Sequence, residues 1–550
     1  MKHYTKEQFV KDLLSGVIVA IIALPLSIAL AIASGVSPEK GLYTAIIAGF
    51  FISFLGGSRV QIGGPTGAFM VIVLGIVTQY GYEGLVIATI MAGIFMILLG
   101  LFKLGSFIKF IPFPITTGFT SGIALVIFSS QIKDFFGLNI SEVPSDFIEK
   151  WGSYFSNLGS INWAATLLGI LSVLIIVLFP KISKKIPGAL VALVLTSLLV
   201  RVFGLDVETI GSKFGELSSK FPSFSFPDIT FDKIKVLISP AIVIALLGSI
   251  ESLLSAVVSD GMIGSKHRSN MELVAQGTAN IASVLFQGIP ATGAIARTVA
   301  NIKNGGRTPI AGIVHSLTLL LILLLFMPLA KMIPLSSLAA ILFVVAYNMS
   351  EWREFKNLFS SPKSDVLVLV VTFLLTVMVD LVVAIEVGMI LAVFLFMKRM
   401  SEISSVNFKS LDSSEDEVNF DFSQVSKKYE TDRDIIIYEI NGPFFFGAAD
   451  KFLDLINTLG EKNKHIIIGM KHVPVIDATA LHAFKRMLNT CDRHHIDVYV
   501  TGVGKEPYGT LKNAGLTKRI GEDHFLKSIE EAKSYLQEVK TLPTTPQPEF

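Results

Sequence analysis

Runs of apolar residues, each about as long as a bilayer is thick, recur up to about residue 400. They cover 85–101, 161–179, 238–258, 310–329 and 366–396, and the last is long enough for two passes. A helix needs about 20 apolar residues to cross the hydrocarbon core. Polar and apolar residues do not alternate within these runs, which excludes a membrane β-barrel. The chain is therefore expected to be a polytopic helical membrane protein.

The composition supports this class and excludes several others. Apolar residues make up 51% of the chain and charged residues only 16%, whereas soluble domains carry about 25% charged residues. The single cysteine, Cys491, excludes an intramolecular disulfide and a cysteine metal cluster. No GxGxxG, phosphate-binding loop, HExxH or Ser/His/Asp constellation stands out. We expect neither an enzyme nor a metal or cofactor site, and the net charge of +2 gives no sign of a nucleic-acid partner.

The distribution of lysine and arginine predicts the orientation in the membrane. These residues concentrate in the loops that lie on the same side as the N-terminus, and the opposite loops hold few outside 204–236. The N-terminal sequence MKHYTKEQFVKDLL is polar and lacks a signal-peptide pattern. By the positive-inside rule both termini are expected in the cytoplasm, with the chain in the inner membrane and in contact with lipid.

The polarity of the chain changes near residue 400. We interpret 1–400 as the transmembrane domain, 401–430 as a linker, 431–540 as a small α/β domain and 541–550 as a disordered tail. Alternating apolar runs predict strands at 435–440, 465–470 and 496–501, and helices at 448–459, 480–493, 507–514 and 525–539.

An internal repeat lies within the membrane region. The sequence Gly-Gly-Pro-Thr-Gly-Ala-Phe at 63–69 recurs as Gly-Ile-Pro-Ala-Thr-Gly-Ala-Ile at 288–295. Glycine and proline interrupt a helix, and a short apolar run follows each copy. A pair of ordinary turns is the alternative. The repeat favours two half-helices that meet near the midplane, as in transporters built from inverted repeats.

Two half-helix N-termini provide a binding site for an anion from backbone groups. Their unpaired N–H groups and the positive ends of their dipoles attract negative charge. The residues expected there are Thr66, Gly67 and Ala68 in the first copy, and Thr292, Gly293 and Ala294 in the second. Arg297 lies one turn beyond Gly293, where it is expected to neutralise the anion or to pair with a carboxylate.

An acidic residue occurs inside the apolar run 238–258. Glu251 has Ser255 one turn away, and the offset between the two copies aligns Glu251 with Pro25. Pro25 and Ser27 are therefore expected on the equivalent helix of the first repeat, beside the same cavity. Glu251 is the candidate for proton coupling. Na⁺ coordination by Glu251 and Ser255, or a salt bridge between Glu251 and Arg297, are the alternatives. His315, Asp380 and Glu386 are expected to be satisfied packing or interface groups.

Several motifs resemble the SulP family of anion transporters, whose vertebrate relatives include pendrin and prestin. They are ALPLSIALAIASGVSPEKGLYTA, GGSRVQIGGPTGAF, ESLLSAVVSDGMIGSKHRSNMELVAQGTANI and GIPATGAIARTVANIKNGGRTPIAGIVH. The resemblance implies a helical membrane fold of two inverted repeats of seven segments, with core and gate subdomains. It also implies a homodimer, an elevator-like movement of the core, and an anion held between the half-helices.

The C-terminal region resembles a STAS domain, and the resemblance implies a site for regulation. The turn before its helix reads Asp477-Ala478-Thr479-Ala480, so Thr479 occupies the phospho-acceptor position. The neighbouring residues depart from the usual Asp-Ser-Ser-Gly pattern, and helix capping by Asp477 and Thr479 is the alternative. The domain is expected to aid folding, dimer contacts or the docking of a cytoplasmic protein.

Among SulP transporters the motifs look most like the C4-dicarboxylate type, which carries fumarate or succinate. Bicarbonate and sulfate are the other candidate anions. The sodium-coupled bicarbonate type has Asp where this chain has Glu251, which favours protons as the coupling ion. An uncoupled anion channel or exchanger, a voltage-responsive motor and an anion sensor remain as alternatives.

Overall fold

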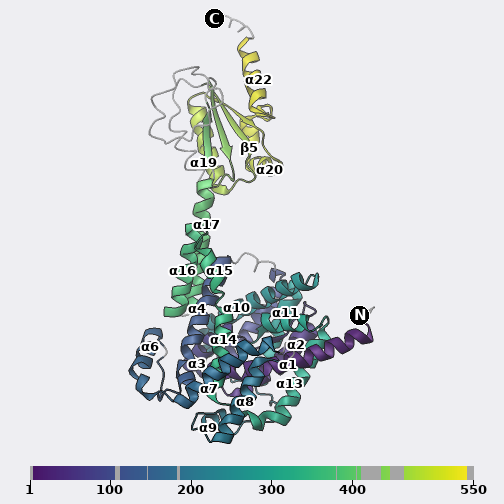
Figure 1. The fold of residues 1–550 in the computed structure, drawn as a ribbon. Helices are drawn as coiled ribbons and strands as arrows, with labels where there is room; N and C mark the ends of the chain where they lie inside the picture. The colour runs from purple at the N-terminus through teal and green to yellow at the C-terminus, as the bar shows by residue number, and fades with distance from the viewer. Residues whose placement is uncertain are drawn as a thin grey trace, which may run out of the picture. The chain divides into compact units, whose positions relative to one another are not determined.

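The computed structural model describes residues 4–105, 112–144, 146–182, 186–379, 381–403, 405–409, 435–445 and 464–541. The chain divides into two compact units, Met1–Ala392 and Val393–Phe550 (Figure 1). The predicted helix 448–459 and Asp380 lie outside the described residues, as do most of the predicted linker and the predicted tail 541–550 except Thr541, which ends the last helix.

The membrane unit is a sequence of helices that repeats in order. The first set is α1 (Lys6–Ala33), α2 (Pro38–Leu55), α3 (Gly67–Leu101), α4 (Phe113–Ser130), α7 (Trp163–Leu178) and α8 (Gly188–Phe203). The second is α10 (Phe231–Ile263), α11 (Ser269–Leu285), α12 (Ile295–Lys303), α13 (Pro309–Ala330), α14 (Leu335–Met349), α16 (Lys363–Met378) and α17 (Leu381–Ile403). Shorter helices are α5 (Ile132–Phe136), α6 (Phe147–Ser156), α9 (Ile210–Phe214) and α15 (Trp352–Leu358), and single 3₁₀ turns are η2 (Leu158–Ser160) and η3 (Phe179–Lys181).

Helix α3 consists of two arms. Gly81 at φ 70° and ψ 177° interrupts it, so that 67–80 and 82–101 are separate helices. With the two arms counted apart, seven described segments of the first half match seven of the second in order, from α1 with α10 to α8 with α17. The expected two repeats of seven are confirmed in the part of the chain that the structure describes.

Many of these helices expose apolar side chains on their outer faces. By length and composition, seven of the described helices are long and apolar enough to cross a membrane. Leu167 and Leu174 on α7 and Val194 and Leu198 on α8 are among the large exposed side chains. Because lipid is as apolar as these side chains, such faces are suited to the bilayer and not to water.

The helices of the membrane unit pack in two groups. In one group, α10 and α11 pack on α3, while α13 packs on α1 and α2. In the other, α16 packs on α4, and α14 packs on α4 and α7. This division agrees with the expected core and gate.

Threonine residues cap the N-termini of several of the helices. The hydroxyl oxygens of Thr5, Thr230 and Thr308 accept hydrogen bonds from the amides at the starts of α1, α10 and α13. Such caps satisfy N–H groups that have no partner within the helix.

Two very short strands join the halves of the membrane unit. Strand β1 (Gly63–Gly64) pairs antiparallel with β2 (Thr292–Gly293), with Gly63 opposite Gly293 and Gly64 opposite Thr292. A two-fold axis in the membrane plane requires this antiparallel arrangement of equivalent segments.

The second unit is a five-stranded sheet with helices. Its strands are β3 (Ser405–Lys409), β4 (Ile435–Asn441), β5 (His465–His472), β6 (Asp497–Thr501) and β7 (Phe525–Leu526), in that order across the sheet. Only the β3–β4 pair is antiparallel. The helices are α19 (Ala478–Arg493), α20 (Lys505–Asn513), α21 (Leu516–Ile520) and α22 (Ile529–Thr541), with a 3₁₀ turn η5 (Glu522–His524).

This sheet confirms the predicted strands 435–440, 465–470 and 496–501 and differs from the prediction in two places. Residues 405–409, expected in the linker, form β3 and pair with β4. The predicted helix 525–539 starts at Ile529, because Phe525 and Leu526 pair with β6. Edge strands depend on pairing with distant residues, which a local pattern does not reveal.

Candidate anion site

The site lies where two extended segments cross, one between α2 and α3 and the other between α11 and α12. Beyond the β1–β2 pair, the amide of Ala294 donates to the carbonyl oxygen of Ile62 over 2.8 Å. Helix α3 begins directly after Thr66, and α12 begins after Ala294. Thr292 therefore lies in β2, three residues before its helix, and not at the helix start that the sequence predicted.

Glu251 on α10 connects the two segments. Its Oε2 atom accepts a hydrogen bond from the Thr66 hydroxyl over 3.0 Å and from the Thr292 hydroxyl over 3.1 Å. The two hydroxyl oxygens are 3.4 Å apart. The next residue, Ser252, accepts a hydrogen bond from the Gly293 amide over 3.1 Å. One turn of α10 thus contacts equivalent positions of both repeats.

Arg297 extends from α12 back to the segment of the other repeat. The side chain is only 3% exposed, and Nη2 donates to the Pro65 carbonyl oxygen. A Cβ on Gly64, which has φ 150°, would collide with the guanidinium group. No ion pair between Arg297 and Glu251 occurs among the described residues, so the salt-bridge alternative has no support. Arg297 supplies an uncompensated positive charge beside both helix N-termini.

Buried polar side chains hold the segment that leads to β2. Asn280 accepts from the Ala291 amide over 2.8 Å and donates to the Ala291 carbonyl over 2.9 Å. The Ile289 amide donates to the Thr44 hydroxyl over 2.7 Å. Because each backbone group of this non-helical stretch needs a partner at membrane depth, these side chains replace the missing helical bonds.

The segment that leads to β1 is held in the same manner. Asn301 donates to the Val60 carbonyl over 2.8 Å, and the Ile62 amide donates to the Thr298 hydroxyl over 3.1 Å. Both side chains come from α12, so a helix of the opposite repeat positions the segment that leads to β1, as Thr44 of α2 does for the segment that leads to β2. Rigid placement of the N-terminal amides is what a backbone anion site requires.

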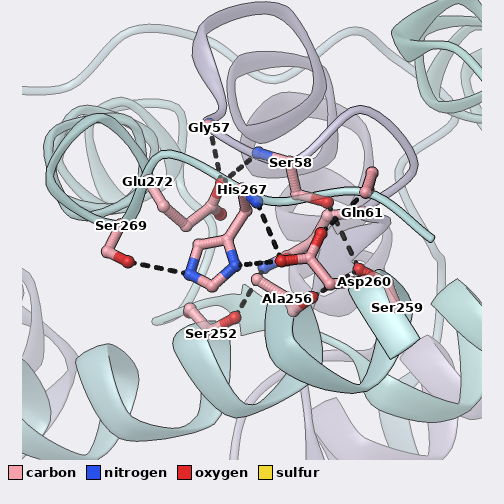
Figure 2. Close-up of polar contacts among 11 residues, drawn as sticks. Gly57, Ser58, Gln61, Ser252, Ala256, Ser259, Asp260, His267, Ser269 and Glu272 are labelled. Carbon is pink, nitrogen blue, oxygen red and sulfur yellow. Dashed lines mark hydrogen bonds and ion pairs between the residues drawn. The ribbon is translucent and has the colours of Figure 1, made fainter. Parts of the chain in front are cut away.

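A buried carboxylate fixes the far end of this segment (Figure 2). Glu272 Oε2 accepts from the amides of Gly57 and Ser58 over 2.8 and 3.0 Å, and Gln276 donates to Oε1 over 2.9 Å. No described cation pairs with this carboxylate, and backbone N–H groups balance its charge instead.

A second chain of polar contacts lies in the loop before α11. Figure 2 shows His267 between Asp260 and Ser269, with Nδ1 2.7 Å from the Asp260 carboxylate and Nε2 2.9 Å from the Ser269 hydroxyl. The His267 amide also donates to Asp260 over 2.8 Å. This chain connects the end of α10, which carries Glu251, to the start of α11.

The other predicted residues divide between the site and its surroundings. Gly67 and Ala68 form the first turn of α3, and a Cβ on Gly67 would lie 3.2 Å from Met349 Sδ of α14. The Ser255 hydroxyl is 3.4 Å from that of Thr298. Pro25 and Ser27 are buried on α1, but neither belongs to the hydrogen bonds that define the site.

In the second unit, Thr479 is exposed in the first turn of α19. Asp477 caps this helix by accepting from the Ala480 amide over 2.7 Å. The capping role expected of Asp477 is confirmed.

Most of the supporting residues were not predicted from the sequence, namely Thr44, Ser252, Asn280, Thr298 and Asn301. The fold buries each of these polar side chains fully or almost fully. Polar residues at membrane depth are functional candidates, but single serine, threonine and asparagine residues are too common in helices to be recognised without their partners.

Comparison with known proteins assigns both parts of the chain. Residues 9–372 match the sulfate permease family, and residues 426–532 match the STAS domain. The chain is 44% identical over 532 residues to YvdB of Bacillus subtilis, which bears the name of a sulfate transporter, covering 96% of this chain and 98% of YvdB. It is 32% identical to the bicarbonate transporter BicA of Picosynechococcus, covering 95% and 93% of the two chains.

Solved structures agree with the fold. The transmembrane domain of a cyanobacterial BicA matches with a TM-score of 0.62 at 32% identity, covering 71% of this chain and 98% of that one. SLC26A9 matches with a TM-score of 0.85 at 18% identity, covering 98% and 91%, and so supports the fold alone. These relatives are transporters and not enzymes. The chain belongs to the sulfate permease (SulP) family of anion transporters and carries a C-terminal STAS domain.

Proposed function

We propose that this chain is a secondary active transporter that carries a small anion and a proton together across the inner membrane. The observation that carries the proposal is the position of Glu251. A single carboxylate oxygen accepts from Thr66 and Thr292, one from each repeat, where the two helix N-termini meet.

Charge balance supports coupling at this position. Ionised Glu251 opposes Arg297 and the two helix dipoles, each equivalent to about half a positive charge. Once Glu251 takes up a proton, only positive charge remains to face the anion. Proton binding therefore raises anion affinity, and by linkage anion binding raises proton affinity to the same extent.

The same site restricts the substrate. Arg297 is the one cationic side chain among the described site residues, and the rest of the attraction comes from backbone amides. This arrangement favours a compact anion such as bicarbonate or sulfate, for which relatives are named. A C4-dicarboxylate, which the motifs favoured, needs donors for a second carboxylate and is the less supported candidate. Na⁺ in place of the proton is the alternative coupling ion, favoured by the Ser255 and Thr298 hydroxyls.

Further parts of the proposal concern the movement and the assembly. The separate packing of α1–α3 with α10–α13, and of α4, α7, α14 and α16, supports movement of one group against the other. We propose an elevator-like movement, a homodimer and cytoplasmic termini, with the STAS domain as a docking site for a protein partner.

Uptake of radiolabelled bicarbonate, sulfate, fumarate and succinate into proteoliposomes tests the function. With an imposed inward proton gradient, we expect accumulation of at least one anion, rising as external pH falls. Glu251→Gln, which keeps the hydrogen-bonding shape, should bind anion but lose the dependence on pH. Glu386→Gln, an exposed residue of α17, is the matched control and should behave as the wild type.

Three results would contradict the proposal. Full acid stimulation in Glu251→Gln would exclude coupling through this residue. Accumulation driven only by an imposed Na⁺ gradient would favour the sodium alternative, and equilibration without accumulation would indicate a channel.

A further inference from the structure

Helix α13 carries an imidazole that the proposed transport cycle does not use. His315 is completely buried, and within the described residues neither Nδ1 nor Nε2 has a hydrogen-bond partner. The sequence predicted a satisfied packing or interface group, but no protein atom among the described residues satisfies the ring. A buried polar group without a partner costs about 1–3 kcal/mol, and such groups in native proteins call for a water, an ion or a function.

His315 lies behind the anion site, next to β1. A Cβ on Gly49 of α2 would lie 3.9 Å from His315 Nδ1 and 3.2 Å from the Gly63 carbonyl oxygen. The adjacent residue, Gly64, contacts the Arg297 guanidinium group. The imidazole and the guanidinium group therefore flank neighbouring residues of the same two-residue strand.

Helix α2 lies against both groups, at two different residues. Ala45 lies against Gly64, where Arg297 approaches, and Gly49 lies against His315. Ala45 and Gly49 are one helical turn apart, which corresponds to about 5–6 Å. No direct hydrogen bond joins the two side chains among the described residues, and a water can bridge polar groups that do not meet directly.

Other polar atoms near His315 also lack a hydrogen-bond partner among the described residues. Arg297 Nη1 and the Ser316 hydroxyl have no partner among the described residues, and both side chains are almost fully buried. A Cβ on Gly49 would lie 3.0 Å from the Ser316 hydroxyl, so Ser316 belongs to the same group. Buried waters are found where two to four such polar atoms converge.

We propose that His315 is a positioning residue for Arg297 and acts through one buried water. Arg297 Nη1 donates to the water, and the water donates to an unprotonated ring nitrogen of neutral His315. With Nη2 bound to Pro65, this second contact fixes both ends of the guanidinium fork. The positive charge then stays beside the helix N-termini and cannot turn toward Glu251. The inference rests on the proposed anion site.

A double-mutant cycle tests the inference in the full-length protein. His315→Leu should raise the KM for bicarbonate or sulfate uptake about tenfold, with little change in kcat, because the charge is misplaced but the coupling residue is intact. In an Arg297→Lys background the same change should have no further effect, because lysine lacks the planar fork. His315→Gln, which keeps a hydrogen-bonding group, should recover most of the lost affinity.

Controls separate positioning from folding and from the function itself. Leu319→Ala removes buried packing one turn along α13 and should lower the melting temperature without raising KM. Stabilisation of the detergent-solubilised protein by added sulfate or bicarbonate measures binding without transport. If His315→Leu does not fold, His315→Gln and Ser316→Ala are compared in the same way.

An unchanged KM in His315→Leu, or an equal increase in both backgrounds, would overturn the positioning role. A wild-type protein that neither binds nor transports any anion would overturn the proposed function instead.

Discussion

At the scale of single residues, buried amides and hydroxyls decide the geometry of the site. Asn280 uses its amide group to bond both the N–H and the carbonyl of Ala291. Glu251 then joins Thr66 and Thr292 across the two repeats. Each such contact is worth only about 1 kcal/mol net, but its loss leaves backbone groups unpaired at membrane depth, which costs more.

Replacing Asn280 should therefore destabilise the protein and leave the segment before β2 less rigidly placed. We expect Asn280→Ala to lower the free energy of unfolding by about 2–4 kcal/mol and to raise the KM for the anion. Asn304→Ala is the control, since among the described residues the Asn304 side-chain amide donates only to the Ala300 carbonyl one turn back, near the end of α12. Thermal melting in detergent checks stability, and equal melting temperatures for the two variants would contradict the argument.

At the scale of elements, the helical arm of α3 that starts at the anion site is short because Gly81 interrupts the helix. The first arm of α3 ends at Gly81. The φ of 70° and ψ of 177° at Gly81 form a conformation that essentially only glycine adopts. Nothing lies within 4 Å of a Cβ at Gly81. Any cost of a side chain there comes from the backbone alone.

Gly81→Ala should accordingly cost about 1–3 kcal/mol without any steric clash. Gly75→Ala is the matched control, because Gly75 lies in the helical first arm and also has no atom within 4 Å of its Cβ position. That substitution should be neutral or slightly stabilising. Melting temperatures of both variants check the prediction, and equal shifts would contradict it.

At the scale of the whole molecule, the two units have separate cores. The core of the second unit includes Phe444, Phe484 and Cys491, the chain's one cysteine. Burial raises the pKa of the Cys491 thiol to about 12. The folded state thus favours the neutral thiol, and its contribution to stability is complete below the unfolded pKa near 9 and is lost as pH rises toward 12.

Cys491 should therefore report the folding of the STAS domain. At pH 8 we expect a thiol reagent to react slowly with the native protein and rapidly once the domain unfolds, while above pH 9 the unfolding itself should become easier. Labelling as a function of denaturant and pH measures this. Adding sulfate or bicarbonate should stabilise the membrane unit without changing the labelling, and fast labelling at pH 8 in buffer would contradict the burial.

The amino-acid sequence alone was enough to assign the class of protein and to predict where an anion site would lie. Apolar runs of bilayer length admit only helices, and two glycine-rich breaks in matching positions mark where those helices stop. The spacing of Glu251 and Arg297 from those breaks identified the titratable and cationic candidates. These conclusions follow from short-range rules, which a single chain displays directly.

Only the tertiary structure decided how the two breaks meet. The β1–β2 pairing, the contact of Arg297 with Pro65 and the support from Thr44 and Asn301 all join residues of opposite repeats. A buried hydrogen bond depends on which distant groups the fold brings together, and hydropathy and helical spacing contain no information about that. The same reason explains why His315 was expected to be satisfied, although the fold leaves its ring without a protein partner among the described residues.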